Sequence, residues 1–462
     1  MGFHTPSQLR AEFSRRLSIM YGTEVPAYTT LVEVSEEVNR DFLSHRGEDA
    51  ERLGSIDRVT AERHGAIRVG SPTELAQVAR VFAAFGMHPV GFYDLRDASA
   101  ASVPVVSTAF RPITASELAQ NPFRVFTSML TADDPRFFTP DQQQRLQDFL
   151  ASRTLFPDAL VELADQATQD GGLEDGDAEQ LLTLATAAFE LSDEPVDHAW
   201  YRELEAVSAV AADIGGVATT HINHLTPRVL DIDELYQRME ARGITMIDEI
   251  QGPPSWEGPD VLLRQTSFRA LSEERTFRFE DGTIGPGSLR VRFGEVEQRG
   301  IALTPAGREL YDQMLAEVDR RKAETGDTRM AVARAVWEEN LPATEAGMLE
   351  RGLGYFTFEL ADQPADIGDT VHLRDLLADG TVTATPIVYE DFLPRSAAGI
   401  FQSNLTGEGS KDTAQEGVDY NQEVLSTIIG GPIFDAYDLY QSQVDDSLAR
   451  LEKTLNTTIL TV

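Results

Sequence analysis

The chain has 462 residues, of which 42% are hydrophobic and 25% charged, a composition typical of globular proteins with a sizeable core. Its net charge of −37, with lysine only at positions 322, 411 and 453, would repel phosphate backbones and anionic lipids, so we expect neither a nucleic-acid partner nor a membrane partner. Because cysteine is absent, disulfides, thiolate zinc sites and cysteine nucleophiles are excluded, and any metal site must use histidines and carboxylates.

The length indicates two or three structural units, at roughly 150 residues per domain. No run of about 18 apolar residues occurs, so no transmembrane helix is expected. The N-terminal sequence MGFHTPSQLRAEFSRR contains no apolar signal core. We therefore expect a cytoplasmic protein.

The first predicted units are an N-terminal helical segment, 1–60, and a mixed module, 61–113. Apolar residues three and four positions apart in LRAEFSRRLSIMYG and TLVEVSEEVNRDFL indicate the helices. In the module, HGAIRVG is strand-like, and Ser71, Pro72 and Glu74 form a capped helix start. The strands HPVGFYDL and VPVVSTAFRPI complete a strand–helix–strand–strand unit.

Residues 114–212 are predicted to form an all-helical insertion, and a second module follows at 213–303. In this module VATTHINHLTP is strand-like, and DIDELYQRMEARG is a helix opened by Asp231 or Asp233. The predicted strands after it are GITMIDEI, DVLLRQTSFRAL, ERTFRFEDG and SLRVRFGEVEQRG. The last unit, 304–462, is expected to combine helices with an irregular apolar stretch, YEDFLPRSAAGIFQSNL.

The strand–helix–strand order thus occurs twice, about 160 residues apart. A duplicated module that closes one sheet around a central cavity would produce this pattern. Functional side chains are then expected on the strand faces that point into the cavity.

His64 begins a predicted strand, and Arg68 follows it on the same face, because residues an even number apart in a strand point the same way. An arginine beside an imidazole suits a metal-bound substrate that carries a carboxylate. The alternative is a surface arginine and a histidine in a turn, which spacing alone favours slightly.

His221 and His224 lie three residues apart on a predicted strand, so only one of them can face a cavity. His224 shares its face with Ile222, which favours it weakly. A histidine at the strand end, capped by a backbone carbonyl, is the alternative.

Glu295 and Glu297 share a strand face with Phe293. A carboxylate on an inward apolar face is costly to bury unless it is paired or binds a metal. Spacing does not separate the two glutamates, and both could instead lie at a solvated strand end.

Two histidines and one carboxylate on strands of a duplicated module would form the facial triad of non-haem iron. This geometry leaves three adjacent coordination positions open. A 2-oxo acid could occupy two of them and dioxygen the third. A closed structural zinc site would need a fourth protein ligand.

Several uncommon strings together resemble the 2-oxoadipate dioxygenase/decarboxylase family, in register from about residue 25 to beyond 405. These strings are ERHGAIRVG, MHPVGFYDL, STAFRPI, NHLTPRVLDID, RQTSFRAL, FGEVEQRGIALTPAGR and YEDFLPRSAAGIFQSNL. The resemblance implies an α+β fold, a barrel of duplicated βαβββ modules like that of the vicinal oxygen chelate superfamily. It also implies iron(II)-dependent conversion of 2-oxoadipate and dioxygen to (R)-2-hydroxyglutarate and carbon dioxide, in lysine catabolism.

By this resemblance the metal-binding histidines fall on His64 and His224, and the arginine that binds the substrate carboxylate falls on Arg68. Hydroxyphenylpyruvate dioxygenases are similar at greater distance. Their second histidine lies seven residues before an Asp-Ile pair, as His224 does here, and their glutamate lies in a string like F-x-E-x-x-Q-R, which selects Glu295.

The chain departs from the family at one position beside the substrate. The family usually reads FLPVSAAGIFQSNL, and here Arg395 replaces the valine while Ser396 is retained. We expect both residues to contact substrate, and an added cation there could change which 2-oxo dicarboxylic acid is preferred.

Two other functions are consistent with the same scaffold. The first is a metal-dependent isomerase or lyase, or a dioxygenase that acts on a related 2-oxo acid. The second is a binding or storage protein that retains only the scaffold, which the set His64, Arg68, His224 and Glu295 argues against.

Overall fold

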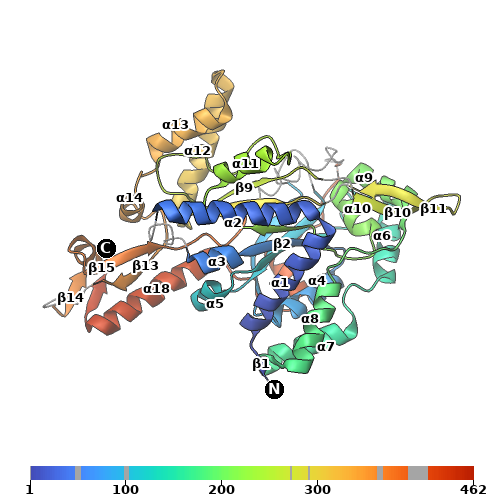
Figure 1. Ribbon diagram of the computed structural model, residues 1–462, viewed down its shortest axis with the longest axis horizontal. Helices are drawn as coiled ribbons and strands as arrows, with labels where there is room; N and C mark the ends of the chain where they lie inside the picture. Colours follow the sequence, from blue (N-terminus) through green and yellow to red (C-terminus); the bar gives the residue numbers. More distant parts are fainter. Residues whose placement is uncertain are drawn as a thin grey trace.

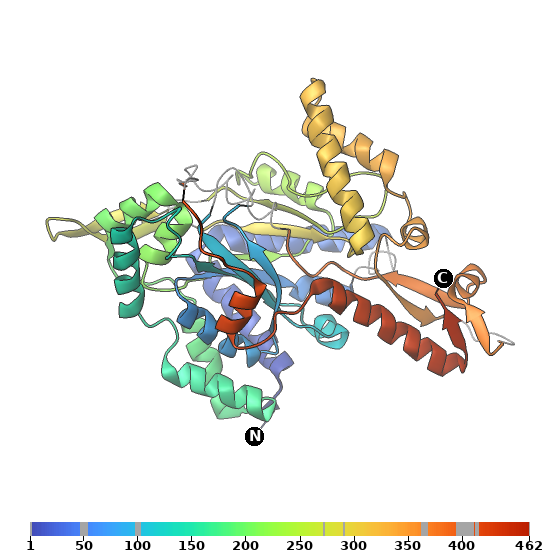
Figure 2. The ribbon, with the colours of Figure 1, turned by 180° about the vertical axis from the view of Figure 1, so that it is seen from behind.

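The computed structural model describes residues 2–46, 54–97, 103–270, 273–289, 292–361, 368–393, 411 and 415–461. It is an α+β protein, with strands at its centre and helices around them (Figures 1 and 2). The helices are α1 Pro6–Glu24, α2 Pro26–Arg46, α3 Ile56–Ala61, α4 Pro72–Ala83, α5 Ala115–Gln120, α6 Pro140–Ser152, α7 Asp158–Asp170, α8 Asp175–Ala187, α9 His198–Val207, α10 Ala209–Gly216, α11 Ile232–Ala241, α12 Pro305–Glu324, α13 Arg329–Asn340, α14 Glu345–Glu350, α15 Leu373–Ala378, α17 Gln422–Ile429 and α18 Ala436–Leu455. The strands are β1 Phe3–His4, β2 Arg63–Val69, β3 His88–Asp94, β4 Val105–Arg111, β5 Arg124–Leu130, β6 Leu173–Glu174, β7 Val196–Asp197, β8 His224–Pro227, β9 Leu263–Ser267, β10 Glu273–Arg278, β11 Ile284–Leu289, β12 Glu295–Arg299, β13 Phe356–Leu360, β14 Thr370–His372, β15 Val382–Pro386 and β16 Thr458–Leu460.

A five-stranded sheet in the order β3-β4-β5-β2-β8 forms the centre. β2 runs parallel to β5 and antiparallel to β8. Ile67 and Val69 on one face of β2 belong to a core that includes apolar residues of α1, α2 and α4, whereas Ala66 on the other face packs in a separate core with Phe126. Because both faces are covered, every residue of β2 after Arg63 is buried.

The series of strands continues beyond β8. The amide of Val229 donates a hydrogen bond to the carbonyl of Glu297 at 2.8 Å, which links the end of β8 to β12. β12 in turn pairs antiparallel with β9. Beyond β9, Met246 forms an isolated bridge with Phe268, and Gln251 forms one with a residue of β9. β8 therefore lies between β2 and β12 and connects them.

The predicted helix starts of both modules are confirmed. The side chain of Ser71 accepts a hydrogen bond from the amide of Glu74, with Pro72 in the first turn of α4. The side chain of Asp231, and not that of Asp233, caps α11 in the same way. These capping bonds satisfy amides that have no partner inside the helix, so they depend only on local sequence.

The prediction that residues 114–212 are all helical is wrong. β5 lies within this range and pairs with both β2 and β4 in the central sheet. All seven residues of β5, RVFTSML, are buried. A short buried strand shows no alternation between apolar and polar residues, so its period does not distinguish it from a buried helix.

Three strand predictions in the second module also need correction. Only His224–Pro227 of VATTHINHLTP is a strand, and GITMIDEI contributes only the isolated bridge of Met246. The segment SLRVRFGEVEQRG does not form one strand, because β11 ends at Leu289 and β12 begins at Glu295. β10 and β11 form a hairpin that stands out from the body (Figure 1) and pairs with β7, so it lies outside the central sheet.

The C-terminal region has its own apolar core, built around α12, α13, α18 and the β13–β15 pair. The strands in this region were not predicted. α12 and α13 form a helical hairpin that projects from the rest of the molecule in both views (Figures 1 and 2). In the described part of the chain, no helix combines the length and the apolar character needed to cross a membrane.

Candidate metal centre

Three buried side chains from three strands meet at one point: His64 of β2, His224 of β8 and Glu295 of β12. One nitrogen of each histidine and one carboxylate oxygen lie within 4.8 Å of one another. Nε2 of His64 lies 3.4 Å from one Glu295 oxygen, and Nδ1 of His224 lies 3.5 Å from the other. These three donors could hold a metal ion.

Sheet pairing brings these residues together across long stretches of sequence. In the β2–β8 register, Ala66 lies opposite His224, so His224 shares the inward face of β2 with His64. Gly65 allows the close approach of the segment before β8, since a Cβ at this position would come within 2.8 Å of the Ile222 side chain. Glu295 is the first residue of β12, the strand joined to the end of β8.

The charge states of the two histidines differ because their neighbours differ. Burial lowers the pKa of His224 to about 4, so this imidazole is neutral near pH 7. Burial also opposes a charge on His64, but the nearby carboxylates of Glu297 and Glu295 raise its pKa above the usual value. Within the described residues, Nδ1 of His224 has no hydrogen-bond partner. A neutral imidazole with an unsatisfied buried nitrogen fits a metal ligand, because a metal binds only the deprotonated nitrogen.

Aromatic rings enclose the centre. Phe392 packs against the edge of His64 with ring centroids 5.1 Å apart, and Phe293 lies 5.6 Å from His224. The amide of Gln265 donates to Glu295 at 3.4 Å. Phe392 comes from the C-terminal region, so that region contributes to the walls of the site.

Arg68 lies four residues after His64 on the same face of β2 and is held by α10. Its Nη1 donates to the carboxylate of Asp213 in α10, which also accepts from the Asn223 amide at 3.0 Å. His221 lies 3.2 Å from the other Asp213 oxygen. His221 thus lies outside the group formed with His64 and belongs to the cluster around Arg68. No sequence signal pointed to Asp213, since it lies in a short helix and its partners lie outside that helix.

A buried network of arginines and glutamates lies next to His64. Arg124 of β5 donates to Glu62 at 2.7 Å, lies 3.3 Å from Glu297, and also contacts Glu390. Arg299 binds Glu297 through two bonds of 2.8 and 2.9 Å. Sequence reasoning missed this network. Its signal was the alternation in ERH and EVEQR, which places Glu62 with His64 and Arg299 with Glu295 on inward faces.

Two expected substrate contacts, Arg395 and Ser396, lie outside the described residues. The described chain approaches them as far as Leu393, next to Phe392. Their roles remain predictions.

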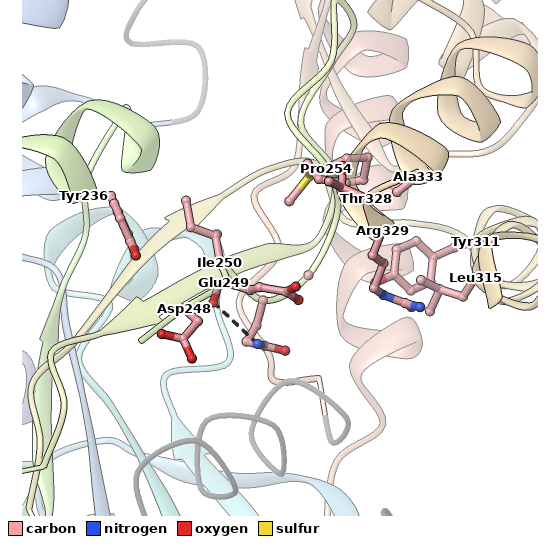
Figure 3. Close-up of a pocket in the computed structure, with 13 residues that line it drawn as sticks. Tyr236, Asp248, Glu249, Ile250, Pro254, Tyr311, Leu315, Thr328, Arg329 and Ala333 are labelled. Carbon is pink, nitrogen blue, oxygen red and sulfur yellow. Dashed lines mark hydrogen bonds between the residues drawn. The ribbon is translucent and has the colours of Figure 1, made fainter. Parts of the chain in front are cut away.

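A separate hollow of about 410 Å³ lies between the 248–254 segment and the helical hairpin of α12 and α13. Figure 3 shows Tyr236, Asp248 and Glu249 on one side of it and Tyr311 and Arg329 on the other. None of the three residues of the candidate metal centre lines it. The Arg329 side chain is already paired with Asp319.

The fold and the site together define a class of protein: an α+β protein with a buried centre of two histidines and one carboxylate. A family model described as 2-oxoadipate dioxygenase/decarboxylase matches residues 13–404. A relative of that name from Mycobacterium tuberculosis is 56% identical over 446 residues, which are 96% of this chain and 97% of the relative. The chain therefore belongs to the 2-oxoadipate dioxygenase/decarboxylase family, a family of enzymes.

Solved structures agree with this assignment. The hydroxyglutarate synthase of Pseudomonas putida, crystallised in complex with 2-oxoadipate, superposes with a TM-score of 0.84 at 39% identity and covers 99% of this chain and 100% of its own. A protein from Ralstonia eutropha assigned to the glyoxalase superfamily superposes with a TM-score of 0.50 at 20% identity over 64% of this chain and 85% of its own. This second likeness concerns the fold alone.

Proposed function

We propose that this protein is an iron(II)-dependent dioxygenase that converts 2-oxoadipate and dioxygen to (R)-2-hydroxyglutarate and carbon dioxide, in the cytoplasm and as a step of lysine catabolism. The observation that carries the proposal is the buried group of His64, His224 and Glu295 in a chain of this family. The reaction balances with no further co-substrate. Six-carbon 2-oxoadipate loses one carbon as carbon dioxide, and the two atoms of dioxygen enter the new carboxylate and the new hydroxyl.

Iron(II) is the metal we assign to the site. Two imidazoles and one carboxylate form the facial triad typical of non-haem iron oxygenases, whereas a structural zinc site would take four protein ligands. Bound iron(II) would supply the activation of dioxygen that drives oxidative decarboxylation. Two neutral imidazoles and one carboxylate leave about one net positive charge at the metal, which attracts a dianionic substrate despite the acidic surface.

Arg68 has the role of binding a substrate carboxylate. It lies on the same inward face as His64 and is buried. Its Nη1 pairs with Asp213, which holds the planar guanidinium in a fixed orientation suited to carboxylate recognition. The rings of Phe392 and Phe293 would exclude water from the reacting atoms. We assign Arg395 and Ser396 to the same substrate pocket.

We also propose that the strands form a duplicated barrel of two βαβββ modules. The first would comprise β2, α4, β3, β4 and β5, and the second β8, α11, the 246–251 segment, β9 and β12. The contacts that support it are the pairings of β2 with β8 and β5, and of β12 with β9. The metal ligands would then come from equivalent first strands and from the last strand of the second module.

Oxygen consumption tests the proposed reaction. Apo-protein loaded anaerobically with iron(II) is expected to consume oxygen with 2-oxoadipate and to release carbon dioxide in equal amount. Five- and seven-carbon 2-oxo acids measured in the same oxygen electrode define the preference, including any change due to Arg395. Turnover of substrate without oxygen uptake would instead indicate a metal-dependent isomerase or lyase.

Loss of Arg68 is expected to weaken substrate binding and to leave the metal in place. Arg68→Ala should raise the KM for 2-oxoadipate by about 10- to 100-fold, the effect of losing one charged hydrogen-bonded pair. Asp213→Asn should raise it less, because the arginine keeps its charge but loses its anchor. Arg80→Ala, which removes an arginine from a half-exposed ion pair with Asp165, is the control and should leave KM unchanged. Iron loss in Arg68→Ala with an unchanged KM would contradict the role.

A further inference from the structure

Glu297 is not one of the three candidate ligands, but its carboxylate contacts one of them, His64. Resting on the proposed function of that group, we propose that Glu297 is a positioning residue: its carboxylate holds Nδ1 of His64 and thereby directs Nε2 toward the metal. The inference concerns how tightly and in which orientation the metal is held. Glu297 thus joins the three candidate ligands among the side chains that determine metal binding.

The two ring nitrogens of His64 face two different carboxylates. Nδ1 lies 2.7 Å from Oε2 of Glu297, and Nε2 lies 3.4 Å from Oε2 of Glu295. Within the described residues this contact is a short ion pair, and Nδ1 forms no regular hydrogen bond. A metal at Nε2 leaves the ring proton on Nδ1, next to Glu297. A carboxylate that accepts this proton fixes the tautomer of the ring and strengthens Nε2 as a donor.

Glu297 is itself held rigidly. Both of its oxygens accept from Arg299, and Arg124 lies 3.3 Å away. Arg299 also donates to the backbone carbonyls of Tyr389 and Asp391 at 2.7 and 3.0 Å. The glutamate is completely buried, and the arginines fix it in position. It therefore presents a preorganised acceptor to His64.

Strand alternation explains why both glutamates reach the same histidine. Glu295 and Glu297 are two residues apart on β12 and share its inward face. β8 lies between β12 and β2, and its residue Thr226 lies opposite His64. The ring of His64 nevertheless lies near both glutamates of β12, with one carboxylate at each ring nitrogen. One glutamate is placed to bind the metal, and the other is placed to orient its ligand.

Glu62 is a matched control in the same network. It is as fully buried as Glu297, accepts from Arg124 at 2.7 Å and lies 3.6 Å from Arg299. No ion pair joins it to His64 in the described part of the chain. Removing its charge should therefore disturb the arginines much as removal of the Glu297 charge does, without touching the metal ligand.

Cobalt(II) binding to the full-length apo-protein tests the proposal without relying on activity. In titration calorimetry, Glu297→Gln should weaken cobalt affinity by about 10- to 100-fold, the usual effect of losing such a partner. Glu297→Asp keeps the charge beside Arg299 but draws the carboxylate away from His64, so it should also weaken binding. Glu62→Gln should bind cobalt within about threefold of the wild-type affinity, although both glutamine variants should melt at a lower temperature than wild type.

The outcomes distinguish a failure of the positioning role of Glu297 from a failure of the metal site. Wild-type affinity in both Glu297 variants, or an equal loss in Glu62→Gln, would overturn the positioning role. If wild-type protein binds no cobalt, or His64→Ala binds it as tightly as wild type, the metal site itself fails. If the variants do not fold, 15N spectra of zinc-loaded wild-type protein labelled with [15N]histidine test the orientation of the His64 ring. They should show the His64 proton on Nδ1 and the metal on Nε2, and the reverse would contradict the proposal.

Discussion

Replacing His64 or Glu295 with alanine is expected to yield folded protein that retains no iron and consumes no measurable oxygen with 2-oxoadipate. Each variant removes one of the three donors that meet within 4.8 Å, and two remaining donors hold a divalent ion weakly. Activity should fall by more than about a thousandfold, because the metal performs the oxygen chemistry. Iron content by mass spectrometry and oxygen uptake measure the two effects together.

His88→Ala provides the control for the loss of a histidine. His88 begins β3 and packs against Phe434, away from the three ligands, so this variant should keep its iron. Adding excess iron(II) should not restore activity to the His64 or Glu295 variant. Full iron content and full activity in either of them would remove the residue from the metal site.

Replacing Arg124 with methionine is expected to destabilise the protein by about 3–5 kcal/mol, or to prevent folding. Arg124 is completely buried and contacts Glu62, Glu297 and Glu390. Without it these carboxylates remain buried with fewer cationic partners, and the cost of desolvating their charges is no longer offset. Urea unfolding of wild-type and variant protein measures the difference in free energy of unfolding.

Arg80→Met is the matched variant for this comparison. Arg80 pairs with Asp165 at the surface, and both side chains are 50% exposed. Exposed pairs of this kind contribute about 0–1 kcal/mol, so Arg80→Met should change the free energy of unfolding little. Equal effects of the two substitutions would show that the buried network does not stabilise the fold.

Local sequence was sufficient where a structural element depends on neighbouring residues. The capped start of α4 at Ser71 and Pro72 and that of α11 at Asp231 follow from side chains that bond amides three positions ahead. β2 was predicted because its sequence has the residues of a strand between clear turn signals. β5 was missed, because its residues are buried by pairing with β2 and β4, and this pairing leaves no signal in the local sequence.

Alternation indicated which residues share a face of each site strand, but it did not decide which face points inward or what each residue does. Alternation placed Glu295 and Glu297 together without separating them. In the structure Glu295 lies near both histidines, while Glu297 lies behind His64 against Arg299. His221 was a rival of His224 in sequence, and it turns out to belong to the Asp213 cluster.

The sequence by itself determined that this protein has no thiol ligands, which of its candidate residues share a strand face, and that its strings resemble one enzyme family. These properties depend on composition, on the two-residue period of a strand and on shared sequence. The resemblance had also selected Glu295 as the carboxylate. Only the tertiary structure decided what contacts Glu297, what holds Arg68, and that a buried arginine–glutamate network lies beside the centre. The reason is that distances between residues of β2, β8 and β12 are set by strand register and packing across the sheet, and no local pattern encodes them.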